Sequence, residues 1–279
     1  MAGALAALAA FDRLAPHIGN SPTTAVQIAG LALISIPLAT MVPLALAPSA
    51  GVGPRLLLWA APAVLATALL IWSGYSGTPA TLAKLVAASL IGLGLGSLLQ
   101  TPAEIVGIAV LIAAVDIYSV AAGPTKVIVE HHAQVLNAFT LAFHPIGSNG
   151  VAQIGASDFV FFSVFLAAAA RFDLRPTLTW AAMTASFGLT LLLSYQFDRA
   201  LPALPLLSLV FLAAAGRFDL RPTLTWAAMT ASFGLTLLLS YQFDRALPAL
   251  PLLSLAFLTA NADLLAGRIG GRTGSPEGD

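Results

Sequence analysis

The chain contains no cysteine and few charged residues. Because none of its 279 residues is Cys, disulfide bonds and thiolate chemistry are excluded. Charged residues make up only 9% of the chain, whereas a soluble domain carries about 25%. The 12 basic and 12 acidic side chains cancel, and no basic patch indicates a nucleic-acid partner. This shortage of charge argues against a soluble protein and against nucleic-acid binding.

Apolar residues take the place of the missing charges. They make up 58% of the chain, and the mean hydropathy is +0.92. About 20 apolar residues, rising roughly 1.5 Å each, form a helix that crosses ~30 Å of hydrocarbon. We therefore predict an all-α, polytopic transmembrane bundle of about seven to nine spans. The candidate spans are 24–46, 56–73, 80–99, 103–122, 152–170, 176–197, 202–216, 222–243 and 248–266. Before them, we expect a frayed or interfacial segment rather than a signal peptide.

Two further features of the sequence concern the helix packing and the domain organisation of this bundle. Gly92 and Gly96 form a GxxxG pair in the third span, a pattern typical of close helix packing. Residues 164–209 recur as 210–255 with one difference, Ala170 against Gly216, which indicates a duplicated helical hairpin or an assembly error in the source sequence. The predicted parts are N-terminal transmembrane helices, a core with two acidic spans and a proline-led helix, the duplicated hairpin, and a disordered polar tail: 1–102, 103–216, 217–266 and 267–279.

Two aspartates lie in stretches that are apolar enough to enter a bilayer. An ionised carboxylate at mid-helix in lipid costs about 2.5–3.5 kcal/mol on insertion scales, so Asp116 and Asp158 are functional candidates. Each is expected about six residues from the same membrane face, roughly 9 Å below it by helix rise. Pro202 and Pro205 begin a later span that enters from that face. The sequence therefore predicts two acids and a broken helix start at one level of the bundle.

Such a pair suits acid–base chemistry on a peptide. Two close carboxylates cannot both ionise cheaply, so they share a proton. One then takes a proton from water while the other polarises the scissile carbonyl. Irregular backbone next to the prolines is tolerated where it lines a wet cavity or pairs with an extended substrate. The EHHAQ run at 130–134 does not match HExxH, so no metal site is predicted.

These motifs resemble those of the presenilin and signal peptide peptidase family of intramembrane aspartyl proteases. That family carries YD on one span, GxGD on the next and PAL at the start of the last. The matching stretches here are VDIYSV with Asp116, GASD ending at Asp158, and two PAL copies. The resemblance implies a catalytic pair, Asp116 and Asp158, without metal or cofactor. It also implies a substrate site formed by Gly155 with Pro202, Ala203 and Leu204, or with the second copy, Pro248, Ala249 and Leu250.

The chain departs from the family pattern at four points, one of which is that about three spans precede Asp116 where the family generally has five. Val115 stands where the family has Tyr, and Ser157 stands where it has the second Gly of GxGD. The PAL motif is doubled, and the first copy, 202–204, has the spacing from Asp158 that is nearer to the family's. These departures leave a non-catalytic relative open as an alternative. A transporter that couples ions or protons through the intramembrane aspartates is the other alternative.

The expected substrates are single-span membrane proteins or signal peptides, and the expected surroundings are the lipid bilayer. The abundance of Ala, Leu and Arg is typical of a GC-rich bacterial genome, so we expect the inner membrane of a bacterium. Arginines gather on one predicted side, which the positive-inside rule makes cytoplasmic, together with the C-terminus. These arginines are Arg171, Arg175, Arg217, Arg221, Arg268 and Arg272. The oligomeric state is not predicted.

Overall fold

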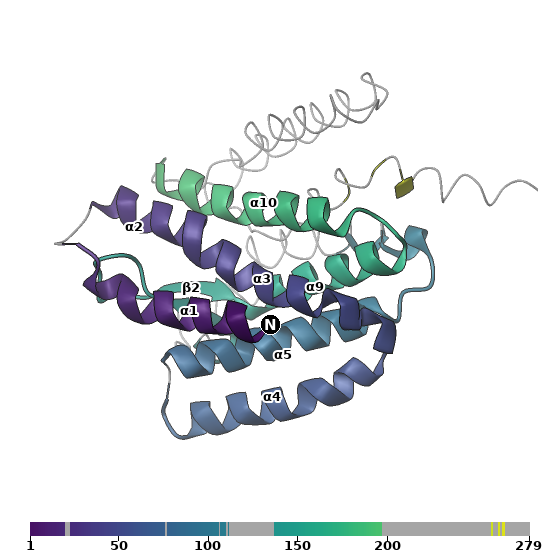
Figure 1. Ribbon diagram of the computed structural model, residues 1–279, viewed down its shortest axis with the longest axis horizontal. Helices are drawn as coiled ribbons and strands as arrows, with labels where there is room; N and C mark the ends of the chain where they lie inside the picture. The colour runs from purple at the N-terminus through teal and green to yellow at the C-terminus, as the bar shows by residue number, and fades with distance from the viewer. Residues whose placement is uncertain are drawn as a thin grey trace, which may run out of the picture.

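A computed structural model describes residues 1–19, 23–75, 77–105, 107–109, 111 and 137–196, with residues 258, 262, 264 and 265. The described part is mostly helical, as predicted, with one short β-hairpin. The main elements in chain order are α1 (Ala2–Leu14), α2 (Thr24–Gly30), α3 (Ile36–Leu46), α4 (Arg55–Trp72), α5 (Thr78–Gly96), β1 (Thr140–Phe143), β2 (Ala152–Gly155), α9 (Ala156–Arg171) and α10 (Pro176–Gln196) (Figure 1).

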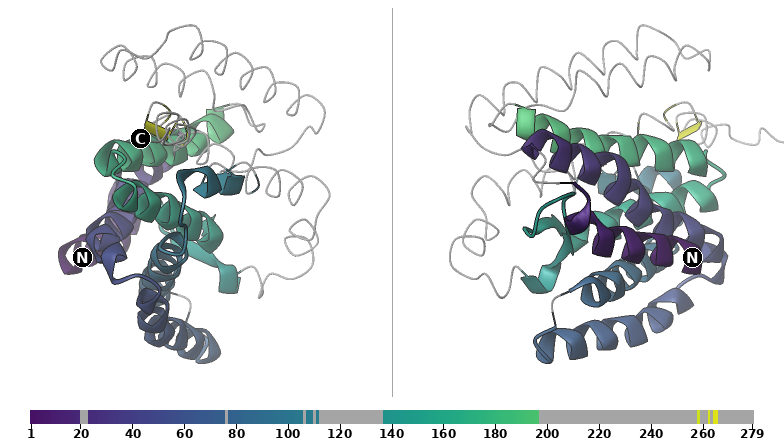
Figure 2. Two further views of the ribbon diagram at one scale, coloured as in Figure 1. Left: turned by 90° about the vertical axis from the view of Figure 1, so that its right-hand side faces the viewer. Right: turned by 60° about the vertical axis from the view of Figure 1, so that its left-hand side comes forward.

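Three described helices are long and apolar enough to cross a membrane. They are Thr24–Val52, Arg55–Trp72 and Thr78–Gly96, and they match the first three predicted spans. The first combines α2 and α3 through a π-helical turn at Leu31–Ser35. Only 11% of the apolar stretch of α4 is buried, against 67% of that of α5. Figure 2 accordingly shows α4 at the outside of the bundle, with α5 between it and α9.

The N-terminal segment is a packed helix, so it is not frayed, and the alternative that it lies at the membrane interface stays a prediction. Helix α1 contacts α3 and α5. Leu8 is only 1% exposed and belongs to a core cluster that also contains Phe143 and Phe159. The burial of Asp12 at 4% exposure is the least expected feature of this helix. Its partners come from other elements, so a local pattern of apolar residues does not reveal them.

The GxxxG pair in α5 packs against α9, as predicted. A Cβ atom built on Gly92 would lie 2.2 Å from the Val160 carbonyl oxygen. One built on Gly96 would lie 2.8 Å from the Val164 carbonyl oxygen. Both distances are far below van der Waals contact, so only glycine lets the two backbones approach this closely. This contact sets where α9, and with it Asp158, stands relative to α5.

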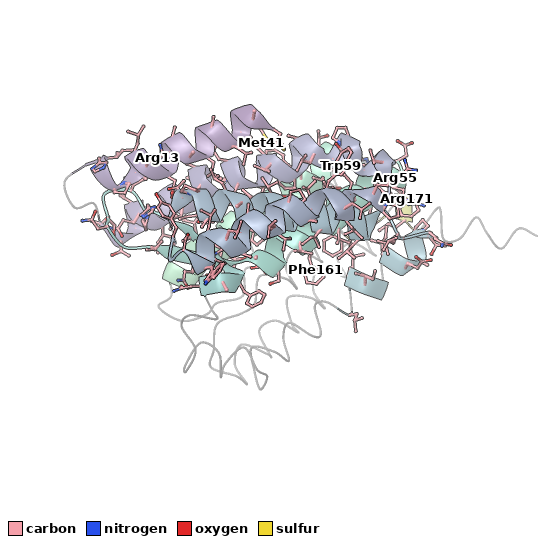
Figure 3. The ribbon with its side chains drawn as sticks, turned by 90° about the horizontal axis from the view of Figure 1, so that it is seen from below. Arg13, Met41, Arg55, Trp59, Phe161 and Arg171 are labelled. Atoms are coloured by element: carbon pink, nitrogen blue, oxygen red, sulfur yellow. The ribbon has the colours of Figure 1, made fainter. Side chains whose placement is uncertain are left out.

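Helix α9 is further held by α10 and by its own C-terminal end. The Phe187 ring of α10 stacks on Phe159 and Phe162, with centroid distances of 5.7 Å and 5.9 Å. At the far end, the Arg171 guanidinium donates a hydrogen bond to the Ser97 carbonyl, just beyond α5. Figure 3 shows Arg171 and Arg55 together at one end of the bundle and Arg13 at the other. The arginines thus mark two opposite ends.

Candidate active site

Asp158 lies near the beginning of a helix, not six residues into a span as predicted. Helix α9 begins at Ala156, and residues 152–155, which we predicted to be helical, form strand β2. Asp158 is therefore the third helical residue, with Gly155 at the N-cap. A negative charge in the first turn is stabilised by the unpaired backbone N–H groups there. The carboxylate has a built-in electrostatic partner in its own helix terminus.

The Asp158 carboxylate folds back over Gly155. A Cβ atom at residue 155 would lie 3.2 Å from Asp158 Oδ2 and 3.2 Å from Ser157 Oγ. Both distances are tighter than ordinary van der Waals contact. Gly155 therefore leaves room for the carboxylate, which gives a physical reason for glycine at the first position of GASD. The Ser157 side chain itself is exposed, while Asp158 is half-buried.

Strand β2, which leads to Asp158, is paired with β1 along one of its two edges. Strands β1 and β2 are antiparallel, with Thr140 opposite Gly155 and Ala142 opposite Gln153. The Thr140 and Ala142 carbonyls accept hydrogen bonds from side chains of α5. Opposite residues in an antiparallel pair turn their backbone groups either both inward or both outward. The N–H and C=O groups of Gln153 and the N–H of Gly155 consequently face away from β1, whereas the Gly155 carbonyl, at the N-cap, accepts the first hydrogen bond of α9.

The outer edge of β1, in contrast, is closed by a row of polar side chains. Lys84 Nζ donates to the Thr140 carbonyl at 2.9 Å and to the Asn137 carbonyl at 2.5 Å. Thr81 Oγ1 donates to the Ala142 carbonyl at 3.1 Å and accepts from the Ala142 N–H at 3.3 Å. These contacts give β1 the hydrogen bonds that a third strand would otherwise supply.

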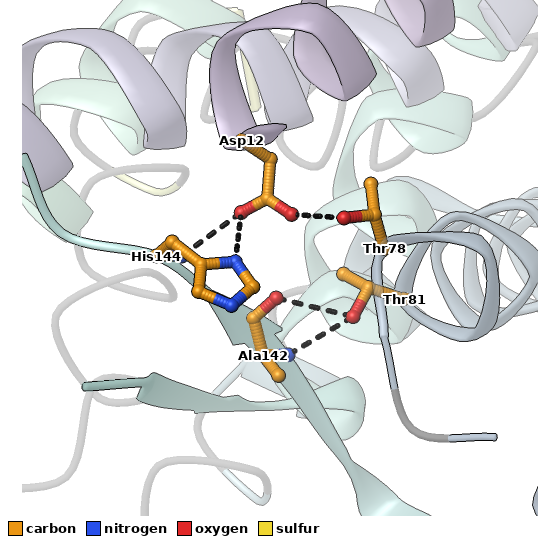
Figure 4. Close-up of polar contacts among 5 residues, drawn as sticks. All are labelled: Asp12, Thr78, Thr81, Ala142 and His144. Carbon is orange, nitrogen blue, oxygen red and sulfur yellow. Dashed lines mark hydrogen bonds and ion pairs between the residues drawn. The ribbon is translucent and has the colours of Figure 1, made fainter. Parts of the chain in front are cut away.

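Asp12 of α1 completes the row at the end of β1 (Figure 4). Its Oδ1 accepts from the His144 backbone N–H at 2.9 Å and lies 3.1 Å from His144 Nδ1. Its Oδ2 accepts from the Thr78 hydroxyl at 2.5 Å. The sequence alone did not reveal this cluster. The one available signal was an aspartate in a largely apolar helix, next to Arg13, and a similar signal identified Asp158.

Except for Gly155 and Asp158, the predicted site residues lie outside the described part of the chain. They are Asp116, Pro202, Ala203, Leu204, Pro248, Ala249 and Leu250. Gly155 and Asp158 are described, and the structure brings these two together. The predicted pairing of Asp158 with Asp116 stays a prediction.

Comparison with curated proteins finds one informative similarity. A presenilin-like protein of Arabidopsis thaliana is 41% identical to the chain over 61 residues. This similarity suggests the presenilin-like family. The matched stretch is 22% of the chain and spans only 15% of the relative's length. No family model and no solved structure matches the chain. Together with the three apolar helices, the similarity supports a membrane protein and is compatible with an intramembrane protease family.

Proposed function

We propose that this chain is an aspartyl protease that cleaves peptide bonds inside the membrane, with Asp116 and Asp158 as its paired carboxylates. The observation that carries the proposal is the placement of Asp158 directly after β2, whose outer edge presents backbone groups that β1 does not use. An extended peptide that pairs with this edge passes its own backbone in front of Asp158.

The dimensions of α9 suit a carboxylate below the membrane surface. Asp158 and Arg171 are separated by about 20 Å along the helix axis at 1.5 Å per residue. With Arg171 at one boundary of ~30 Å of hydrocarbon, Asp158 lies about 10 Å beneath the other boundary. The hairpin then lies at the level where a transmembrane substrate begins.

A strand edge that can pair with the substrate lowers the cost of unwinding a substrate helix in lipid. A helical substrate satisfies its own backbone groups, and unwinding it in hydrocarbon leaves each N–H and C=O without water. The N–H and C=O of Gln153 and the N–H of Gly155 supply partners to the unwound segment. Pairing therefore compensates the cost of exposing the scissile bond and aligns it with the carboxylate in the same step.

In the chemical step, one carboxylate of the pair takes a proton from the attacking water. The other, protonated, donates a hydrogen bond to the scissile carbonyl. Asp158 lies in the first turn of α9, near N–H groups that have no partner within the helix. Substrates are single-span membrane proteins or signal peptides, and one PAL segment shapes the far side of the site. The proposed setting is a bundle of about seven to nine spans in a bacterial inner membrane, with a cytoplasmic C-terminus.

The decisive experiment compares Asp158→Asn with Asp173→Asn in purified, reconstituted protein offered a single-span substrate. Asp173 lies in the turn after α9 with a positive φ of 51°, a conformation that Asn also adopts readily. We expect Asp158→Asn to lower the cleavage rate by about 100-fold or more, and Asp173→Asn to leave it near wild type.

Three results would overturn the proposal. Cleavage that survives Asp158→Asn would remove the carboxylate pair. Proton flux into liposomes that requires Asp158, without any cleavage by the wild type, would favour the transporter. An inactive wild type that gains cleavage on Ser157→Gly would identify a non-catalytic relative, because that change restores the GxGD pattern.

A further inference from the structure

The outer edge of β1 is matched, group by group, to side chains with the right hydrogen-bonding capacity. Lysine only donates, and Lys84 contacts two carbonyl oxygens. A threonine hydroxyl both donates and accepts, and Thr81 contacts the C=O and the N–H of one residue, Ala142. A carboxylate only accepts, and Asp12 contacts the His144 N–H. Such matching distinguishes a constructed contact from accidental proximity of polar groups.

The geometry of α5 and β1 explains why the longest of these side chains is at one end. Thr78, Thr81 and Lys84 are three residues apart on one helix face and advance about 9 Å in total. The strand positions that they serve, from residue 140 to 144, extend over about 13 Å. The long Lys84 stem covers the difference at one end, and at the other Asp12 is interposed between Thr78 and His144.

Resting on the function proposed above, we propose that Lys84 is a positioning residue that sets the register of the β1–β2 hairpin, and thereby selects which substrate peptide bond faces Asp158. The hairpin contains only four residues in each strand. A two-stranded hairpin of this size is marginal on its own. Its position along the bundle therefore depends on what holds β1.

Lys84 is the strongest candidate among these anchors for three reasons. It is only 8% exposed, and its amino group joins the strand to the segment before it. It contacts Thr140, the residue directly opposite Gly155, which precedes the Asp158 helix turn. A shift of the strand by one residue turns every side chain to the opposite face, so loss of this contact alters alignment as well as rate.

The test uses Lys84→Met, which keeps the volume and removes the donors, in the full chain in lipid nanodiscs. Ser89→Ala is the matched control, because Ser89 is buried on the same helix and bonds only within it, to the Leu85 carbonyl. Hydrogen exchange of residues 140–155 is measured by mass spectrometry, and the cleavage products of one single-span substrate are identified by mass. Thr81→Val serves as a second variant.

We expect amides of the hairpin to exchange about ten-fold faster in Lys84→Met, with exchange in α4 unchanged. We also expect a changed ratio of cleavage positions, which a general loss of stability would not produce. Ser89→Ala should alter neither. If the wild type cleaves, and both Lys84→Met and Thr81→Val keep its exchange rates and product ratio, the positioning role of Lys84 is refuted while the proposed function stands. If the wild type cleaves nothing, the proposed function is refuted first, and the role with it.

Discussion

The two edges of the β-hairpin differ in how their backbone groups are satisfied. On the β1 side, Lys84, Thr81 and Asp12 contact the outward N–H and C=O groups. On the β2 side, no side chain of the described residues is seen to contact the outward groups of Gln153, while the Gly155 carbonyl belongs to the first turn of α9. An edge that is closed by side chains holds the strand in place, whereas an open edge is a template for another chain. The contrast separates the anchored side of the hairpin from its receiving side.

The contrast is informative because both edges belong to an apolar bundle. Gln153 on the β2 edge is exposed, and backbone groups of an exposed strand edge can pair with another chain. The open edge ends at Asp158, while the closed edge ends at His144 and Asp12. Four substitutions test the contrast from either side, and they follow in order of expected effect.

The largest effect is expected at Asp12, at the end of the closed edge. Asp12→Ala removes the acceptor for the His144 N–H and for the Thr78 hydroxyl, and leaves both partners without it. We expect a loss of about 2–3 kcal/mol of unfolding free energy. Arg13→Ala, at the exposed neighbouring position of the same helix, should change stability by less than about 0.5 kcal/mol. Thermal unfolding in detergent measures both, and equal effects would contradict the role given to Asp12.

A proline distinguishes the two edges most cleanly. Gln153→Pro removes an N–H that faces away from β1, so the ladder keeps its bonds and a substrate loses one donor. We expect about five- to ten-fold lower kcat/KM with nearly unchanged stability. Gln153→Ala is the control, since it removes only the side-chain contact with Asn137. A proline variant with wild-type kcat/KM would show that the outer edge of β2 is not used.

A smaller effect is expected in the middle of the closed edge. Thr81→Val keeps the shape of the side chain and removes both contacts with Ala142. We expect destabilisation by about 1 kcal/mol. Thr67→Val is the comparison, because the Thr67 hydroxyl bonds to Ala63 within its own helix α4. If Thr67→Val lowers the unfolding free energy as much as Thr81→Val does, the contacts with Ala142 stabilise the protein no more than a hydrogen bond within a helix.

The smallest effect is expected at the space beneath the carboxylate. Gly155→Ala places a methyl group 3.2 Å from Asp158 Oδ2, so the carboxylate must move by a few tenths of an ångström. We expect a decrease of about three-fold in kcat with little change in KM. Gly3→Ala is the control, because a Cβ atom there meets nothing within 4 Å. Wild-type kcat in Gly155→Ala would show that the carboxylate tolerates the displacement.

The sequence was sufficient for the elements that depend on local pattern. Apolar length predicted α4 and α5, and the spacing of Gly92 and Gly96 predicted their close approach to another helix. It was insufficient for the hairpin, because AQIG at 152–155 is a short apolar run that also fits a helix start. It was equally insufficient for Asp12, whose partners Thr78 and His144 are 66 and 132 residues away. Pairing over such separations leaves no local signature.

The most direct test of the open edge is disulfide trapping, which the absence of cysteine makes clean. Gln153→Cys is combined with Asp158→Asn and mixed with single-span substrates that carry one cysteine at successive positions. The account predicts cross-links at alternate substrate positions, because a paired strand presents every second side chain to the same face, and few cross-links from Ala142→Cys on the closed edge. Cross-links without alternation, or equally strong trapping from Ala142→Cys, would contradict it.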